Sequence, residues 1–334
     1  MNYTIGVAIA TFNGQDYLEQ QLESIISQTT LPDFISISDD ASTDETAQIL
    51  ENFKRTSKVA VALNRNKSRV GVIDNFMTAF SGCKTDYIAY CDQDDVWMPE
   101  KISVYREALK SQRISLAFHR STIVDEKLNP IGRFEPFNIR GGIYHFPHFP
   151  DYLWGYGHQM IFSQQVLTAL REIQDAHSKA ISAAGHSFDF GLLLAAGMVG
   201  NIYFIDRELM CFRRHQKSVS VAGKQDSTRS KWGTIGMQDS RLQQTTGLLT
   251  TLVAEMARDA FQPTDDASSL ETYLAHLKVL EGRYLKRVLL NAPKSRLERM
   301  KSFQSLVKAG TYGSPFQNKL PARPCIRDLL SCFV

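Results

Sequence analysis

The sequence of 334 residues has few cysteines, no long hydrophobic run and no glycine-rich phosphate loop. Its five cysteines form no Cys-x-x-Cys pair, which argues against a disulfide framework or a structural zinc site and favours a reducing cytoplasm. Because no stretch of about 18 apolar residues is present, a transmembrane helix is not expected. The N-terminus has no basic region before its short apolar run, so a signal peptide is not expected either. The net charge of +3 is too small to predict nucleic-acid binding.

The composition is that of a soluble globular protein, with 43% hydrophobic and 22% charged residues. Apolar runs over the first 110 residues predict strands at 4–11, 34–38, 59–63 and 86–91. The segments between and after them predict helices at 13–28, from a Ser42–Glu45 capping box onward, at 70–82 and at 99–110. This alternation indicates parallel βαβ units in a doubly wound sheet.

The pattern changes from about residue 114. Residues 114–132 predict strands around a turn near Lys127 to Pro130, and residues 188–198 predict an apolar helix. The runs at 201–206 and 209–215 are typical of a hairpin. A polar stretch at 222–231 predicts a linker, and residues 232–334 have the pattern of amphipathic helices.

Polar side chains follow three of the predicted strands at the point where each strand ends. Asn13 follows the first strand, Asp39 and Asp40 end the second, and "CDQDD" (91–95) closes the fourth. Ligands of open α/β sheets bind outside the carboxyl ends of the strands. The sequence therefore predicts that these clusters converge on one site.

The acids of "YCDQDDVW" (90–97) repel one another unless water screens them or a cation lies between them. Mg²⁺ or Mn²⁺ is typically held by one or two carboxylates together with substrate phosphates. The alternative is a solvated turn that caps the next helix. The position at a strand end favours the cation, and so does the absence of a glycine-rich phosphate loop. Asp39 and Asp40 could accept hydrogen bonds from a base N–H or a ribose hydroxyl.

Four segments together resemble the family 2 glycosyltransferases of GT-A fold, most closely their bacterial rhamnosyltransferase-like branch. They are "VAIATFNGQDYLEQQLESIISQT", "ISDDASTDET", "VGVIDNF" and "YIAYCDQDDVWMPEKI". The resemblance implies an α/β fold, a GT-A-type doubly wound, mostly parallel sheet flanked by helices, with an α-helical C-terminal extension. It implies a catalytic domain over 1–222, with a nucleotide-sugar half (1–110) and an acceptor half (111–222), followed by a helical region over 223–334.

The resemblance also implies roles for single residues. Donor nucleotide contacts fall on Thr11, Phe12, Asn13, Asp39, Asp40, Arg69, Gly71, Asn75 and Asp92. Asp92 and Asp94 match the Asp-x-Asp pair, with Asp94 as the direct metal ligand. Asp95 is expected behind the metal ligands or facing the sugar.

The general base matches Asp189 in "HSFDFGLLLAAG" (186–197), although Phe188 and Phe190 replace the family's His and Trp. His186, three residues away, is an alternative candidate for the base. The non-catalytic alternative for Asp189 is that it caps the helix that follows. In "FRRHQKS" (212–218), His215 matches a metal or diphosphate ligand, with Arg213 or Arg214 on phosphate. An inert surface histidine is the alternative there.

Aromatic side chains in "YLWGYGHQMIF" (152–162) suit a saccharide acceptor, and they equally suit the packed floor of a cleft. The acceptor-site residues expected are Trp154, Tyr156 and His158, together with Trp97 and Asp95. Residues 283–308 form a basic amphipathic segment, which predicts either contact with an anionic membrane surface or a solvated helical face.

These expectations describe an inverting glycosyltransferase that depends on Mg²⁺ or Mn²⁺. Its donor would be a nucleotide-diphosphate sugar, dTDP-rhamnose or a UDP-sugar, and its acceptor a surface polysaccharide or lipid-linked oligosaccharide. No nucleic-acid partner is expected, and the location is the cytoplasm or the inner face of the cell membrane. The rival readings are a nucleotidyltransferase, which usually needs the missing glycine-rich loop, and an inactive carbohydrate-binding protein.

Overall fold

The computed structural model describes residues 3–110, 113–134, 140–144, 156–171, 188–216, 301, 303–305 and 307–308. The chain divides into two compact units, Met1–Ala176 with Ser187–Ala222, and His177–His186 with Gly223–Val334. In the second unit the backbone is helical at the few described positions between 301 and 308. The first unit contains the sheet and the described site residues.

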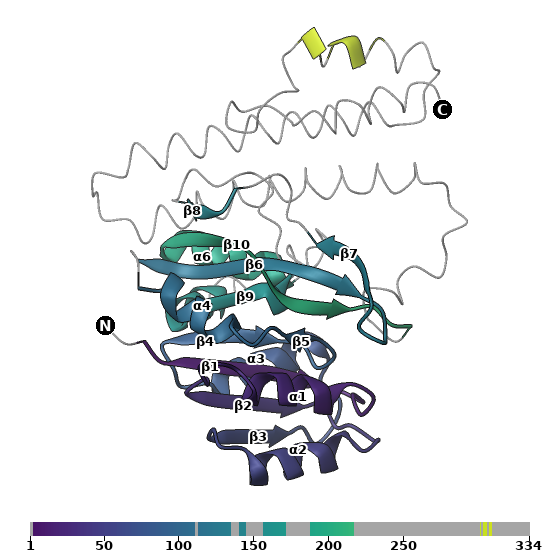
Figure 1. The fold of residues 1–334 in the computed structure, drawn as a ribbon. Coiled ribbons are helices and arrows are strands. Elements are labelled where there is room, and N and C mark those ends of the chain that lie inside the picture. The colour runs from purple at the N-terminus through teal and green to yellow at the C-terminus, as the bar shows by residue number, and fades with distance from the viewer. Residues whose placement is uncertain are drawn as a thin grey trace. The chain divides into compact units, whose positions relative to one another are not determined.

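One ten-stranded sheet organises the first unit (Figure 1). Its main order is β3 (Val61–Arg65), β2 (Phe34–Asp39), β1 (Ile5–Thr11), β4 (Tyr87–Cys91), β9 (Met160–Ser163), β6 (Ile114–Val124), β10 (Asn201–Arg213) and β5 (Val96–Trp97). Strand β7 (Pro130–Phe134) pairs with β6, and β8 (Gly142–Tyr144) pairs with β10. Neighbours from β3 to β4 are parallel, as are β6 and β10, whereas β9 runs antiparallel between β4 and β6.

Helices cover both faces of this sheet (Figure 1). On one face, apolar side chains of α1 (Leu18–Ile26), α2 (Thr46–Thr56) and α4 (Lys101–Ala108) join alternate residues of β1 in one buried cluster. On the other face lie α3 (Val72–Gly82) and α6 (Phe188–Val199). There the Phe80 ring of α3 lies 5.1 Å from Phe162 of β9 and 6.0 Å from Phe188 of α6. Burial on both faces explains the continuous apolar run of β1.

The strands predicted at 4–11, 34–38 and 86–91 and the helix at 188–198 are confirmed to within about a residue. The third strand begins at Val61, later than expected, although Val59 is already buried in the core. The predicted turn near Lys127 to Pro130 is confirmed between β6 and β7, where the Asp125 carboxylate accepts the Lys127 and Asn129 amides.

Two local predictions are wrong. The segments 201–206 and 209–215 form no hairpin, because β10 is a single strand that pairs in parallel with β6. Its charged middle is accommodated by register shifts on either side of Glu208. The predicted capping box at Ser42–Glu45 is also wrong, because α2 begins at Thr46. The Ser42 hydroxyl donates to the Asp39 carboxylate and does not cap the helix.

Candidate functional site

The site lies where β1, β2 and β4 end, as the sequence predicts for parallel strands. The acidic loop, residues 92–95 after β4, contains Asp92, Asp94 and Asp95. It leads into β5, which pairs with β10. This pairing brings the end of β10, residues 213–215, onto the acidic loop. Residues more than 100 positions apart in the sequence therefore meet at the end of β4.

Each acid of this loop has a partner of its own. Asp92 Oδ2 lies 3.1 Å from His158 Nδ1, and Asp94 Oδ2 lies 2.8 Å from His215 Nε2. Asp95 Oδ1 accepts the backbone N–H of Arg213 at 3.0 Å. Each carboxylate therefore has a polar partner within the protein, while the charges of Asp94 and Asp92 still act on the buried Asp95.

Asp95 lies beneath the site, since it is fully buried. Burial, and then the charges of Asp94 and Asp92, raise the pKa of Asp95 well above its usual value. Its Oδ2 atom has no hydrogen-bond partner among the described residues and lies 3.8 Å from His158 Nδ1. Trp97 is also buried, at 3% exposure, so both residues support the acidic loop from below rather than facing solvent.

Among the described residues, two groups of side chains could hold a divalent metal ion. Asp94 and His215 offer a carboxylate and an imidazole 2.8 Å apart, and the Asp94 side chain is 21% exposed. Asp92, Asp95 and His158 offer three ligand atoms within 4.8 Å of one another. One ligand in each group can be reached by a phosphate from solvent, since the Asp94 side chain is 21% exposed and the Asp92 side chain is 33% exposed, whereas His215 is 7% exposed. In the second group, Asp95 and His158 are almost completely buried.

Arg213 fixes the acidic loop in place. Its side chain is buried, with Nε donating to the Asp94 carbonyl at 2.8 Å and Nη1 to the Glu126 carbonyl at 2.8 Å. Its Nη2 donates to Gln20 Oε1, and its guanidinium lies 4.6 Å from the Tyr17 ring centroid. The structure therefore uses Arg213 to hold backbone rather than presenting it to a phosphate.

Asp39 and Asp40 are buried and shape the rim beside the acidic loop. Asp39 accepts the Thr11 hydroxyl at 3.0 Å and the Ser42 amide at 3.1 Å. Asp40 accepts the backbone amides of residues 70 and 71 at 2.7 and 2.9 Å. Burial opposes ionisation of Asp40, but these amides, the Asn66 side chain and Arg69 together hold its pKa below the usual value.

The same rim contains the remaining residues expected to contact a nucleotide. Asn75 is buried and donates to the Thr11 carbonyl at 3.1 Å. The Arg69 guanidinium lies 4.1 Å from the centroid of the Phe12 ring. Asn13 adopts a left-handed backbone (φ 46°), and its side-chain oxygen accepts the Thr43 amide at 2.9 Å. Phe12 and Arg69 are the members of this group that offer a flat, accessible surface.

Gln93 is a site residue that the sequence analysis missed. Its Oε1 accepts the Phe12 amide at 2.8 Å, and its Nε2 donates to the Phe12 carbonyl at 3.1 Å. A Cβ atom on Gly14 would lie 2.4 Å from Gln93 Oε1, so a side chain at position 14 would displace this amide. Gln93 thereby joins the acidic loop to the end of β1. Only its place between the acids could have suggested this role.

Asp189, in the first turn of α6, lies at the same site. The Gly157 amide donates to its carboxylate, and a Cβ on Gly157 would lie 2.7 Å from Asp189 Oδ1. Burial, and then the charge of Asp92, raise the pKa of Asp189 to about 6, although His158 and the Gly157 amide oppose the rise. A carboxyl group with such a pKa is suited to accept a proton near neutral pH.

The aromatic residues expected at an acceptor site have different positions. Tyr156 is half-buried, with its ring centroid 4.4 Å from Phe134 and 5.5 Å from His158. His158 is 3% exposed and hydrogen-bonds Asp92, so it belongs to the floor of the site. Trp154, His186 and most of the basic segment 283–308 lie outside the described residues.

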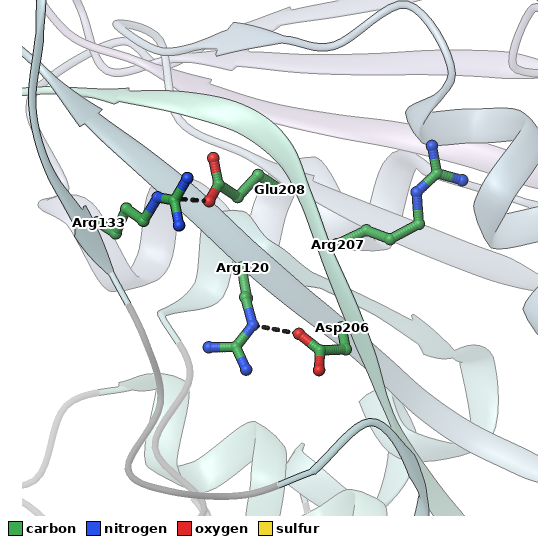
Figure 2. A pocket seen from close by; sticks show the side chains of 5 residues that line it. All are labelled: Arg120, Arg133, Asp206, Arg207 and Glu208. Atoms are coloured by element: carbon green, nitrogen blue, oxygen red, sulfur yellow. Dashed lines mark hydrogen bonds and ion pairs between the residues drawn. The ribbon is translucent and has the colours of Figure 1, made fainter.

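A separate hollow of about 500 Å³ lies along β6, β7 and β10. Figure 2 shows its charged side chains, and three ion pairs involve its arginines: Arg120–Asp206, Arg133–Glu208 at 3.0 Å and Arg207–Glu100 at 3.0 Å. Each of these guanidinium groups is already paired with a carboxylate, and two of the three carboxylates line the hollow. The charged residues in the middle of β10, where the sequence predicted a hairpin turn, line this hollow and form these ion pairs.

The comparisons with known proteins concern the family and the fold of the chain. Residues 6–171 match glycosyl transferase family 2. The dTDP-rhamnosyl transferase RfbG of Shigella flexneri is 37% identical over 98 residues, 28% of this chain and 34% of that protein. The UDP-Glc:alpha-D-GlcNAc-diphosphoundecaprenol beta-1,3-glucosyltransferase WfaP of Escherichia coli is 30% identical over 114 residues, 34% of this chain and 44% of that protein. The matched segments thus span less than half the length of these curated relatives.

Among solved structures, residues 1–349 of S. aureus TarS in complex with UDP-GlcNAc match with a TM-score of 0.55. The two sequences are 14% identical, and the match covers 93% of each chain, so the likeness concerns the fold alone. The mostly parallel, helix-flanked sheet confirms the expected fold class. Within the described part of the chain, no helix has the length and apolar character needed to span a membrane.

Proposed function

The chain contains a family 2 glycosyl transferase domain with a GT-A-type sheet, and from this premise we propose that it is an inverting, metal-dependent glycosyltransferase. The observation that carries the proposal is a raised-pKa carboxyl, Asp189, beside an acidic loop that offers metal ligands. A proton acceptor and a site for a diphosphate leaving group are the two elements that single-displacement glycosyl transfer needs.

The donor binds across the ends of β1, β2 and β4. The nucleotide lies along the rim that Thr11, Phe12, Asp39 and Asp40 build, with its base near the Phe12–Arg69 pair. Asp94 and His215 would hold Mg²⁺ or Mn²⁺, with Asp92 beside them. When bound, the metal acts as a Lewis acid that stabilises the negative charge developing on the diphosphate.

Asp189 acts on the acceptor. Its carboxylate removes the proton from an acceptor hydroxyl while the hydroxyl oxygen bonds to the anomeric carbon of the donor sugar. The bond from that carbon to the diphosphate oxygen breaks at the same time, and a nucleoside diphosphate leaves. Attack from the face opposite the leaving group inverts the anomeric configuration, through a transition state of oxocarbenium character.

The relatives suggest candidate substrates. The names of RfbG and WfaP point to dTDP-rhamnose and a UDP-sugar as donors, and WfaP's name points to a saccharide on a diphospholipid as acceptor. We therefore propose dTDP-rhamnose or a UDP-sugar as the donor and a lipid-linked oligosaccharide or growing surface polysaccharide as the acceptor. A lipid-linked acceptor would also give the basic segment 283–308 a role at an anionic membrane surface.

The first test is release of nucleoside diphosphate from dTDP-rhamnose, UDP-glucose and GDP-mannose, each measured with Mn²⁺, with Mg²⁺ and with EDTA. We expect one donor to be turned over with either metal, and we expect EDTA to abolish turnover. Without the metal, Asp94 and His215 do not neutralise the negative charge that develops on the departing diphosphate. A thermal-shift measurement with the same donors checks binding separately from chemistry. If no donor is turned over and none shifts the melting temperature in Mn²⁺, the proposal fails.

Replacing Gln93 with leucine tests the link between the nucleotide rim and the acidic loop. The change removes two hydrogen bonds to Phe12, each worth about 0.5–1.5 kcal/mol. We therefore expect the donor KM to rise about tenfold, measured from initial rates at saturating acceptor. Gln48→Leu makes the same change at an exposed position of α2 and should leave the KM unaltered. Equal KM values for the two variants would show that Gln93 does not position the donor.

A further inference from the structure

We propose that Lys101 is a positioning residue for the transfer reaction, holding the short helical turn η1 (Gly157–Gln159) against the base and the acidic loop. Lys101 begins α4 and is fully buried, which is rare for a lysine. Its Nζ donates to the His158 carbonyl at 3.0 Å and lies 4.0 Å from the centroid of the Trp97 ring. This proposal rests on the proposed function.

The turn η1 contacts both the proposed general base and the acidic loop. At its first residue, the Gly157 amide donates to the carboxylate of Asp189. At its second, His158 Nδ1 lies 3.1 Å from Asp92 Oδ2. Three residues therefore join the general base to the acidic loop after β4. Any shift of the turn would move both contacts together.

Side chains from α4 hold the backbone of this turn. Lys101 binds the His158 carbonyl, and the Tyr105 hydroxyl donates to the Gln159 carbonyl at 2.9 Å. From β6, the Ser121 hydroxyl accepts Gln159 Nε2 at 2.7 Å. Because α4 directly follows the acidic loop and β5, Lys101 connects the backbone of that loop to η1 over a short, buried path.

The position of η1 sets the position of Asp189. Gly157 packs so closely that a Cβ there would lie 2.5 Å from the Tyr90 ring and 2.7 Å from Asp189 Oδ1. Catalytic groups misplaced by about 1 Å can lower rates by about 10²-fold. Either protonation state of the Lys101 amine donates a hydrogen bond, so the tether does not depend on its charge. The ammonium form adds positive charge beneath Asp92 and Asp95.

Lys101→Met tests the proposal, since methionine keeps the length and apolar body of the side chain but removes the donor. We expect the kcat of transfer to fall about 10–100-fold, whereas donor KM and donor hydrolysis without acceptor should change less than transfer, because Asp94 and the nucleotide rim still hold the donor. Tyr105→Phe removes the second tether and should lower transfer in the same selective way. The matched control is Lys110→Met, an exposed lysine just beyond α4 that should behave as wild type.

Amide hydrogen exchange of a peptide covering 156–160 gives a readout that needs no turnover. Lys101→Met should lose protection there and keep it over β1 and β4. A wild-type protein that turns over no donor would remove the proposed function, whereas unchanged protection in this peptide would remove the tether. Transfer and hydrolysis falling by the same factor, or neither falling, would also overturn the positioning role. If Lys101→Met does not fold, Tyr105→Phe decides by the same criteria.

Discussion

Asp189→Asn is expected to lower the rate of sugar transfer by about 10²–10⁴-fold, the usual contribution of a general base. The amide keeps the shape of the side chain in the first turn of α6 and can still meet the Gly157 amide through its oxygen. It cannot accept the proton of the acceptor hydroxyl. Donor affinity should remain, because Asp92, Asp94 and the nucleotide rim are untouched. Initial rates of transfer and donor titrations by calorimetry measure the two effects separately.

The pH dependence provides a second test of Asp189. Burial and the charge of Asp92 raise its pKa to about 6, so the wild-type kcat/KM should fall tenfold per pH unit below about pH 6. Above that pH the carboxylate is ionised and this limb becomes flat. The residual activity of Asp189→Asn should lack the limb, because the amide does not titrate. A wild-type profile without an inflection near pH 6 would count against Asp189 as the base.

The same pKa predicts how Asp189 affects stability. Its folded-state pKa of about 6 lies above the ordinary value of 3.8, so the folded state disfavours the charged form. The stabilising contribution of the neutral acid is complete below about pH 3.8 and is lost as the pH rises through about 6. Asp189→Asn should therefore melt at the same temperature as wild type at pH 7, or higher. A lower melting temperature would assign the side chain a structural role.

Asp74→Asn is the matched control, because Asp74 is an exposed acid in the first turn of α3. It should retain wild-type transfer, pH profile and donor affinity. If both variants lose activity to the same extent, the loss reflects a general effect of removing an acid from a helix start. If Asp189→Asn alone transfers at the wild-type rate, another group removes the acceptor proton.

The sequence predicted the placement of the acids well, because it depends on local pattern and a topological rule. Apolar runs identify the parallel strands, and parallel strands direct their carboxyl ends to one edge, which brought Asn13, Asp39 and Asp92 together. The partners of the acids were harder to foresee. His158 reaches Asp92, and Lys101 reaches the His158 carbonyl, through tertiary packing of η1 and α4, and no spacing in the sequence encodes these contacts.

The wrong local predictions have the same physical origin. Ser42 and Glu45 have capping-box spacing, but the buried Asp39 carboxylate needs donors, and the Ser42 hydroxyl and amide supply them. The charged residues between Ile205 and Leu209 resemble a turn, yet the long pairing of β10 with β6 outweighs them, and the strand bulges instead. The first outcome depends on the burial of Asp39 and the second on the pairing of β10 with β6, and a local sequence pattern specifies neither.

Asp94→Ala is expected to remove metal-stimulated transfer. Lewis-acid stabilisation of a leaving diphosphate is worth several kcal/mol, which corresponds to a loss of about 10²–10³-fold or more in rate. His215→Ala should have a similar effect, because its Nε2 lies 2.8 Å from Asp94 Oδ2 and the two would share one ion. Rates measured over a Mn²⁺ titration should show a higher half-saturating concentration for each variant. The double variant should lose little more than either single one.

The metal titration also discriminates between the two possible ligand groups. Glu51→Ala, at an exposed position of α2, controls for the loss of an acid and should leave the titration unchanged. Asp94→Ala should not destabilise the fold without metal, since it removes a charge that repels the buried Asp95. If it leaves the Mn²⁺ dependence unchanged while Asp92→Ala abolishes it, the ion binds among Asp92, Asp95 and His158. That outcome would move the diphosphate toward η1 and away from the end of β10, so the ligand group decides where the leaving group departs.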